Sequence, residues 1–511
     1  MAKIKLQKGA LSWALYDWAN SAYATTVVAG FFPIFFGNYW SAGVSHVDST
    51  FWLGISSSVG TFTIALLSPV IGAIADKGRL RKKALLMFAW LGALATASFF
   101  FVEKGSWPVA AGIYVVSLIL WWAGDSLYNS LLMDVSDDDD VDFLSALGFS
   151  LGYLGGGVLF TLNVLMTLQP QWFGFIDGQI TTLLSTLEDM QKAGTVNDIA
   201  ALTTAVKSLS GSSEIVMAIQ KAPVEFSAVF TLADDAVSSA KAFAVKLSFV
   251  SVAIWWGLFS LPLAFRVKEK HSNEPEIPFA AAVGKGLRQL KNTLKEIRKL
   301  KVLFAFLIAY WLYIDGVDTI ITMAVKIGQS LGFSTANLIT ALLLVQFVGF
   351  PFAWLFGYIG QKTGPKPMIV IALLVYIGVT FLAYSIPAPP AGVENPSPPA
   401  PWLVFGFQIN QFFALAFLIG TVQGGVQSLS RSMYTRLVPA EMAGEFFGFY
   451  NMLGKFAAFF GPLLVAVITK VTGSAQAGLL SLCALFIPGI ILLLRVNEKE
   501  GQELARNFKR Q

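Results

Sequence analysis

The chain has 511 residues, of which 55% are hydrophobic and only 13% are charged. A soluble protein of this length needs many more charged residues to cover its surface, so the composition predicts an integral membrane protein whose helices are surrounded largely by lipid. The net charge of +5 gives no reason to expect a nucleic-acid partner, and one cysteine and two histidines exclude an internal disulfide and a metal site built from cysteine and histidine.

About twelve apolar stretches are long enough to cross a bilayer, and they fall into two groups of six. The first group is expected near residues 11–37, 51–75, 84–102, 107–133, 143–167 and 243–265. The second is expected near 302–325, 336–360, 367–386, 403–433, 446–470 and 476–494. We therefore predict an all-α membrane fold with an N-terminal six-helix half over 1–266 and a C-terminal half with a short tail over 302–511.

Three segments lie outside these stretches. Residues 168–240 are polar, with apolar residues at helical spacing, which predicts an extracytoplasmic insert of short amphipathic helices. Residues 267–301 end in the basic run GLRQLKNTLKEIRKLK, which predicts an amphipathic linker helix on the cytoplasmic lipid surface rather than a nucleic-acid arm. The proline-rich residues 385–401 predict an extended outer loop.

Basic residues indicate the orientation of the chain in the membrane. Lysines and arginines crowd the segment from Lys77 to Lys83, the linker and both tails, and such loops face the cytoplasm. Both termini are therefore expected in the cytoplasm. The first apolar stretch lacks a cleavage site and the tails lack organelle-addressing motifs, which favours a bacterial plasma membrane over a vacuole.

Ionisable side chains inside the apolar stretches are the strongest functional signal, because charges at that depth usually mark a transport pathway. Lys455 is the basic example, and it lies too deep to reach either surface easily. Polar residues also recur at helical spacing in stretches one, four, seven and ten. These stripes contain Asp17 and Asn20, Asp125 and Asn129, Asp315 and Asp318, and Gln423, Gln427 and Arg431.

The two groups of six repeat each other. WALYDWANSAY, with Asp17, matches YWLYIDGVDTI, with Asp315, and GFSLGYLGGG matches GFYNMLGKFA. Repeated halves place a binding site between them near the midplane, and rocking of one half against the other gives alternating access. The pattern predicts a secondary transporter. No nucleophile-base pair or nucleotide loop is recognisable, so neither an enzyme nor ATP drive is expected.

The loops after the second helix of each half read GAIADKGRLRKK and GYIGQKTGPKP. Both resemble the loop signature of the major facilitator superfamily, in which an acid at the helix end bonds arginines. The second copy has an amide where the acid would be. A solvated basic loop is the alternative interpretation. By this resemblance the gating residues are Asp76, Arg79 and Arg81 in the first copy and Gln361 and Lys362 in the second.

A narrower resemblance covers most of the chain outside the insert and the proline-rich loop. LYDWANSAYATTV, GFSLGYLGG and GGVQSLSRSMYTRLVPAEMAGEFFGFYNMLGKFAAFFGPLL are similar to the unknown major facilitator family, which includes the fungal autophagy-related vacuolar effluxers. The resemblance implies a proton-linked or passive carrier, with neutral amino acids as the proposed cargo of the fungal relatives. We expect a monomer in the lipid bilayer with a small-molecule substrate and no cofactor.

Charges of both signs on the cavity helices suggest a zwitterionic substrate. Its carboxylate would face Lys455 or Arg431, its ammonium would face the aspartates, and aromatic side chains would shape an apolar pocket. Asp17 and Asp315 are the expected proton carriers, because an ionised carboxylate without a partner is costly in a low dielectric. The expected substrate-binding residues are Asn20, Tyr23, Asp125, Asn129, Trp311, Tyr313, Asp318, Gln423, Gln427 and Lys455.

Several of these residues also have structural interpretations. Asp125 would bond a neighbouring helix, Asp17 would pair with a basic residue near the cytoplasmic side, and Arg431 would act as a gate or interface anchor rather than contact substrate. The run from Asp137 to Asp140 is read as a solvated loop, with a cation site as the alternative. A lipid or amphiphile transporter of the same fold is the alternative function, ahead of a membrane enzyme or an assembly factor.

Overall fold

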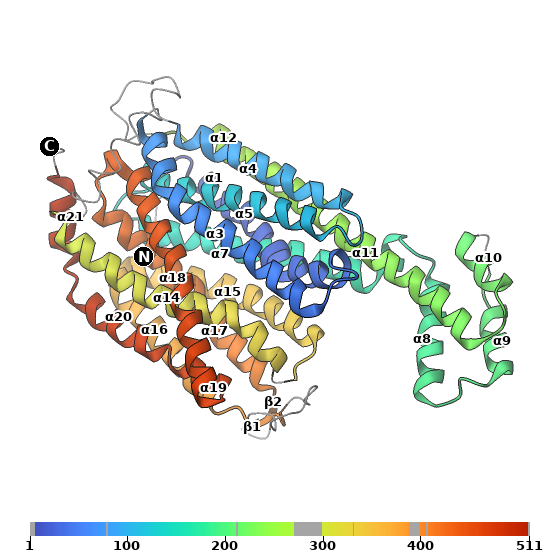
Figure 1. The fold of residues 1–511 in the computed structure, drawn as a ribbon. Helices are drawn as coiled ribbons and strands as arrows, with labels where there is room; N and C mark the ends of the chain where they lie inside the picture. Colours follow the sequence, from blue (N-terminus) through green and yellow to red (C-terminus); the bar gives the residue numbers. More distant parts are fainter. Residues whose placement is uncertain are drawn as a thin grey trace.

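The computed structural model describes residues 6–77, 80–210, 213–269, 299–330, 332–387, 399–404 and 407–508. Within these residues it has twelve helices that are long and apolar enough to cross a membrane, and they pack into one bundle (Figure 1). The predicted all-α membrane fold with twelve spanning helices is therefore confirmed. The expected linker helix lies almost wholly outside the described residues, as does most of the proline-rich loop.

The N-half, residues 6–269, begins with a composite spanning helix. Pro33 lacks an N–H group, so a regular α-helical hydrogen-bond ladder cannot run through it, and the helix passes through π-helical turns on both sides. Its parts are α1 (Ala10–Ala22), η1 (Tyr23–Phe31), α2 (Phe32–Phe35) and η2 (Phe36–Trp40). The other spanning helices are α3 (His46–Lys77), α4 (Arg81–Ser98), α5 (Trp107–Ser130), α7 (Val141–Leu168) and α11 (Phe226–Phe259), with short turns at η3 (Phe99–Phe101), α6 (Leu132–Val135) and α12 (Leu261–Arg266).

The C-half, residues 299–508, repeats this arrangement. Its spanning helices are α14 (Lys301–Ser330), α15 (Thr335–Thr363), α16 (Pro365–Tyr384), α17 (Gln411–Leu437), α18 (Ala443–Thr472) and the pair α19 (Ala475–Leu480) and α20 (Cys483–Arg495). A short turn η5 (Ala440–Met442) precedes α18, and α21 (Glu498–Arg506) ends the described chain.

The tenth spanning helix starts at Gln411, eight residues later than the prediction of 403. The apolar residues before it form an antiparallel hairpin of β1 (Trp402–Val404) and β2 (Phe407–Ile409). Asn410 then starts the helix, because its side-chain oxygen accepts hydrogen bonds from the N–H groups of Phe412 and Phe413. Hydropathy alone does not distinguish such a hairpin from the first turns of a helix.

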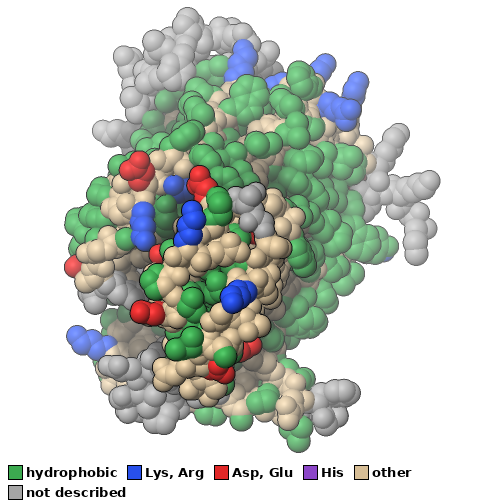
Figure 2. Space-filling view, turned by 90° about the vertical axis from the view of Figure 1, so that its right-hand side faces the viewer, with side chains coloured by type: hydrophobic (Ala, Val, Ile, Leu, Met, Phe, Trp, Pro, Cys, Tyr) green, Lys and Arg blue, Asp and Glu red, His purple; other side chains and the backbone are tan. Residues whose placement is uncertain are grey.

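Each half has its own hydrophobic core, one with residues between 10 and 267 and the other with residues between 300 and 496. The flank of the bundle is also hydrophobic, with side chains such as Phe62, Leu94 and Ile254 more than half exposed. Figure 2 shows this apolar flank behind the charged insert. An exposed apolar flank of this kind suits a protein whose outer solvent is lipid.

The predicted helical insert is present and projects from one end of the bundle (Figure 1). A short turn η4 (Pro170–Phe173) leads to α8 (Gly178–Lys192), α9 (Ile199–Lys207) and α10 (Glu214–Lys221), which share a small core with the first turns of α11. Because α11 runs unbroken from the insert into the bundle, the sixth spanning helix starts well before the predicted residue 243. Both termini lie at the opposite end of the bundle. We call these two ends the insert side and the terminal side.

Candidate functional site

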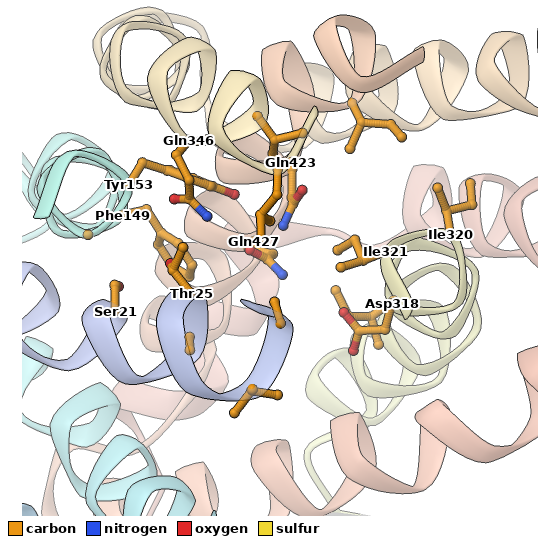
Figure 3. Close-up of a pocket in the computed structure, with 18 of the residues that line it drawn as sticks. Ser21, Thr25, Phe149, Tyr153, Asp318, Ile320, Ile321, Gln346, Gln423 and Gln427 are labelled. Atoms are coloured by element: carbon orange, nitrogen blue, oxygen red, sulfur yellow. The ribbon is translucent and has the colours of Figure 1, made fainter. Parts of the chain in front are cut away.

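A cavity of about 460 Å³ lies between the two halves. Helices α1, α5 and α7 line it from the N-half, and α14 to α19 line it from the C-half. Figure 3 shows three amide side chains, Gln346, Gln423 and Gln427, directed into this space opposite Ser21 of α1 and Thr25 of η1. The volume is in the range of sites for small molecules.

Five acidic or basic side chains line the cavity: Asp17, Asp125, Asp318, Arg431 and Lys455. Each costs free energy when it is charged away from water, unless a partner or a ligand compensates the charge. They come from both halves, so any movement of one half against the other changes their pairing. We therefore describe their partners one group at a time.

Arg431, on α17 of the C-half, reaches into the N-half. Its Nη1 donates to Asn129 Oδ1 at 2.8 Å, and its Nε and Nη2 donate to Ser145 Oγ at 2.9 Å and Ser145 O at 2.8 Å. Its Nη2 also lies 3.6 Å from Asp17 Oδ2 as an ion pair, and this carboxylate oxygen accepts a hydrogen bond of 2.9 Å from Tyr128. The guanidinium is thus engaged in joining the two halves.

Lys455, on α18, is differently placed. Its ammonium lies over the ring of Trp122 on α5 and interacts electrostatically with Asp318 of the C-half and Asp125 of the N-half. Among the described residues it forms no ion pair or hydrogen bond, which leaves its three donors available to a bound group. Asp125 accepts a 2.9 Å hydrogen bond from Asn129, and this links the lysine to the partners of Arg431.

The structure brings most of the expected substrate contacts to the cavity wall. Asp125, Asp318, Gln423, Gln427 and Lys455 all line it. Asn20 and Asn129 also line it, but the side-chain oxygen of Asn20 accepts from the Trp121 indole and that of Asn129 accepts from Arg431.

Four expected site residues do not line the cavity. Tyr23 and Tyr313 lie on the far sides of their helices and bond Ser117 and Ser430 inside their own halves, at 2.7 and 2.6 Å. Trp311 shares the helix face of Asp318 but packs edge-on against Phe460 instead. Asp315 is buried between α14 and α18, where its Oδ1 accepts a 2.9 Å hydrogen bond from Gly461 N.

Sequence reasoning missed several residues of the wall. The main ones are Phe149, Tyr153, Gln346, Tyr450 and Asn451. Two of them carry a signal that was available: Gln346 is a polar residue in the apolar run LITALLLVQFVGF, and Asn451 precedes Lys455 by one helical turn. The aromatic residues carry no such signal, because aromatic side chains occur throughout the apolar stretches.

On the terminal side, the first copy of the loop signature joins the halves. Asp76, near the end of α3, accepts hydrogen bonds from the N–H groups of Gly444 and Glu445 at the start of α18, at 2.9 and 2.8 Å. Arg81 lies 3.6 Å from Asp76 and 2.9 Å from Asp134, a partner that the sequence did not suggest. Arg79 lies outside the described residues.

The second copy makes the corresponding contact in the other direction. Gln361, near the end of α15, accepts at 3.1 Å from the N–H groups of Asp142 and Phe143 at the start of α7, and its Nε2 donates to Asp138 O. Arg436 adds an ion pair of 2.7 Å with Asp142. Lys362 instead donates to Tyr358 on its own helix.

Comparison with known proteins places these features in a family. The family model described as vacuole effluxer Atg22 like matches residues 39–506. The chain is 33% identical over 498 residues to the uncharacterized MFS-type transporter YxiO of Bacillus subtilis, covering 97% of this chain and 96% of that protein. It is 24% identical over 502 residues to autophagy-related protein 22 of Gibberella zeae, covering 92% of this chain and 72% of that protein.

Solved structures agree on the fold. The proton:xylose symporter XylE superimposes with a TM-score of 0.60 at 12% identity, covering 97% of this chain and 95% of that one. The transporter FucP in its outward conformation superimposes with a TM-score of 0.57 at 10% identity, covering 96% of this chain and 98% of that one. These neighbours are major facilitator transporters, not enzymes. With two six-helix halves, a cavity between them and a family match over most of its length, the chain belongs to the vacuole effluxer Atg22 like family of MFS-type secondary transporters.

Proposed function

We propose that this transporter exports a zwitterionic small solute of the neutral amino acid class by proton-linked alternating access. The observation that carries the proposal is a cavity in which the Lys455 ammonium, which forms no ion pair or hydrogen bond among the described residues, lies within electrostatic reach of carboxylates from both halves, Asp125 and Asp318. A zwitterion presents one carboxylate and one ammonium, so it compensates charges of both signs at once. The word effluxer in the family description supports the direction.

The direction of opening follows from where the halves touch. Hydrogen bonds between the halves gather from the cavity to the terminal side, at Arg431, Asp76 and Gln361. The cavity instead extends toward the insert side, past Leu338 and Phe412 near the first turns of α15 and α17. The basic residues at the terminal side support a cytoplasmic location for it, and the bacterial relative supports a plasma membrane. In this proposal the conformation is closed to the cytoplasm.

Asp17 is the first proposed proton carrier. Its carboxylate holds Arg431 against the N-half, so binding a proton would remove the charge that attracts the guanidinium and would loosen the terminal side. Asp315 is the second. Because its carboxylate accepts from Gly461 N, a proton there would change the contact between α14 and α18 rather than the substrate site.

Gating in this proposal is the making and breaking of the terminal-side contacts. Asp76, Arg81, Gln361 and Arg431 bond across the interface or support a residue that does. Opening to the cytoplasm requires all of these contacts to separate, and the substrate and proton would supply the free energy by binding the two states differently.

The test is exchange of labelled neutral amino acids in liposomes containing the purified protein, with and without a pH gradient. Lys455→Ala and Asp318→Asn are expected to abolish saturable exchange. Lys246→Ala is the matched control, because this lysine lies over the ring of Tyr39, outside the cavity. Wild-type rates of exchange in both cavity variants would reject the zwitterion site. Exchange that ignores the pH gradient would reject proton coupling alone.

One observation favours the second candidate, a lipid or amphiphile carrier. The cavity reaches Val379 and Ala383 on α16, a helix whose opposite face exposes Leu374 and Phe381 to the surroundings of the bundle. A single layer of helix thus separates the cavity from lipid at that point. Thermal stabilisation by lysolipids, with none by any amino acid, would favour this candidate over the first.

A further inference from the structure

Asn451 carries an unused hydrogen-bond donor into the cavity. Its side chain is 8% exposed and lines the cavity wall, and its buried Nδ2 atom has no hydrogen-bond partner among the residues that the structure describes. Buried amide groups in proteins are nearly always hydrogen-bonded, because an unsatisfied donor loses its bonds to water without replacement. A donor left open at the wall of a binding cavity points to an acceptor that arrives with the ligand.

Asn451 and Lys455 lie on the same face of α18. They are four residues apart, one helical turn, and both line the cavity together with Gly454. Gly454 places no side chain on this part of the wall, although a Cβ atom there would make only an ordinary contact, 3.5 Å from the Tyr310 hydroxyl. The amide and the ammonium can therefore approach the same ligand group.

The chemistry of this pair selects an anionic acceptor with more than one oxygen. Lys455 supplies positive charge and Asn451 supplies a neutral, directional N–H donor. The carboxylates near this lysine, Asp125 and Asp318, come from α5 and α14 rather than from this face of α18, so they are available to a positively charged group. A carboxylate at α18 and an ammonium nearer Asp318 would satisfy all of these groups.

We propose that Asn451 Nδ2 and the Lys455 ammonium form a carboxylate subsite on α18, in which Asn451 makes the transporter discriminate between an amino acid and the corresponding amine. This inference rests on the proposed function and names the atoms that recognise one end of the solute. Lys455 attracts the carboxylate by charge. Asn451 fixes its orientation, because an amide N–H bonds well only along a narrow range of directions.

The test compares two matched ligand pairs on the purified full-length protein: leucine with 3-methylbutylamine, and phenylalanine with phenethylamine. Each amine lacks only the carboxylate. Asn451→Leu is expected to weaken amino-acid binding by about tenfold or more and to change amine binding by less than about twofold. Asn451→Asp places a carboxylate against the ligand carboxylate, so it should weaken amino-acid binding further and strengthen amine binding.

Asn163→Leu is the matched control. Asn163 is also buried, and its Nδ2 has no partner in the described ranges, but it lies on α7 outside the cavity wall, so its replacement should alter neither ligand series. Thermal unfolding without ligand reports whether each variant is folded. If a folded Asn451→Leu protein loses affinity for the amino acid and the amine equally, or loses affinity for neither, the subsite is overturned while the proposed function stands. A wild-type protein that binds neither amino acid overturns both.

Discussion

The two halves close the terminal side through the same contact, but one copy is charged and the other is neutral. Asp76 at the end of α3 accepts from the first N–H groups of α18, and Gln361 at the end of α15 accepts from the first N–H groups of α7. Each follows a glycine by four residues, Gly72 or Gly357, at which a Cβ atom would collide with the facing helix. Helix N-termini attract acceptors because their first N–H groups have no partner within the helix.

The neighbours of each copy explain the difference in charge. Asp76 lies beside Arg81, which offsets its negative charge. Gln361 lies beside the acidic loop formed by residues 137–140. Its side-chain amide accepts hydrogen bonds from the first N–H groups of α7 and donates one to Asp138 O. A carboxylate at that position would repel the loop and lose the donated bond. The fold therefore repeats the geometry of the contact in both halves, while the neighbouring charges determine whether the acceptor is an acid or an amide.

The repeat extends to the helices behind these contacts. Lys82, next to Arg81, and Lys366, at the start of α16, each bond two carbonyl groups at the end of the last spanning helix of their own half, α12 or α20. The pairs are Lys82 with Ala264 O and Val267 O, at 3.2 and 3.0 Å, and Lys366 with Leu494 O and Val496 O, at 2.7 and 2.9 Å. Cations suit these positions because the last carbonyls of a helix are unpaired.

Removing Arg81 should break the charged copy most severely. Arg81→Ala leaves the carboxylate of Asp134, which is fully buried, without its arginine, and it removes the charge that offsets Asp76. We expect a loss of about 3–5 kcal/mol in stability, because a buried charge that loses its partner is costly. Denaturation of the purified protein measures this. Replacement of the exposed Lys83 should cost far less, and equal losses in the two variants would contradict the role given to the ion pair.

Asp76→Asn should weaken the charged copy without removing its shape. The two N–H groups bond different oxygens of Asp76, so the amide keeps an acceptor for only one of them and also loses the negative charge. About 1–2 kcal/mol of terminal-side closure is therefore expected to be lost. Distances between spin labels on the two halves at the terminal side, in a protein whose Cys483 has been replaced, report the populations of open and closed states. An unchanged distribution would show that the charge does not contribute to closure.

Gln361→Glu makes the neutral copy resemble the charged one. Two effects act on the new carboxylate, and one stabilises the contact while the other destabilises it. The helix N-terminus alone would favour the acid, whereas the acidic loop and the lost bond to Asp138 O oppose it. We expect net weakening of closure by about 1 kcal/mol, measured with the same spin labels. Adding Asp138→Asn to this variant should restore part of the lost closure. Stronger closure in Gln361→Glu alone would mean that the helix terminus outweighs the loop.

The smallest effect is expected at α21, whose Arg506 reaches the acidic loop beside the neutral copy. Arg506 pairs with Asp138, but both side chains are at least half exposed. Exposed ion pairs contribute between about 0 and 1 kcal/mol, and salt screens them. Arg506→Ala should therefore shift closure slightly at low salt and not at high salt. A large shift that survives high salt would assign α21 a gating role that its exposure does not suggest.

Much of the fold was predictable because lipid imposes a simple rule on length and hydropathy. The twelve spanning helices and the helical insert follow from this rule, and the polar stripes containing Asp17, Asp125, Asp318 and Gln423 follow from helical spacing. The errors lie where more than composition matters. The hairpin before α17 is apolar but not helical, and α11 continues into the polar insert because the short helices there bury its first turns.

Within the candidate site, the amino-acid sequence was enough to indicate which residues are too polar for lipid and on which helices they lie. It did not indicate which of these residues face the same cavity. Two residues in one polar stripe of a helix can lie at different depths in the membrane and can pack against different neighbouring helices. Asp318 and Asp315 are three residues apart, yet only the first lines the cavity, while the second bonds the backbone of α18. Only the packing of the helices determines that Arg431 bonds to the N-half, that Lys455 and Asn451 Nδ2 line the cavity without a hydrogen-bond partner in the described part of the chain, and that Gln361 meets an acidic loop. Each of these depends on a helix from elsewhere in the chain.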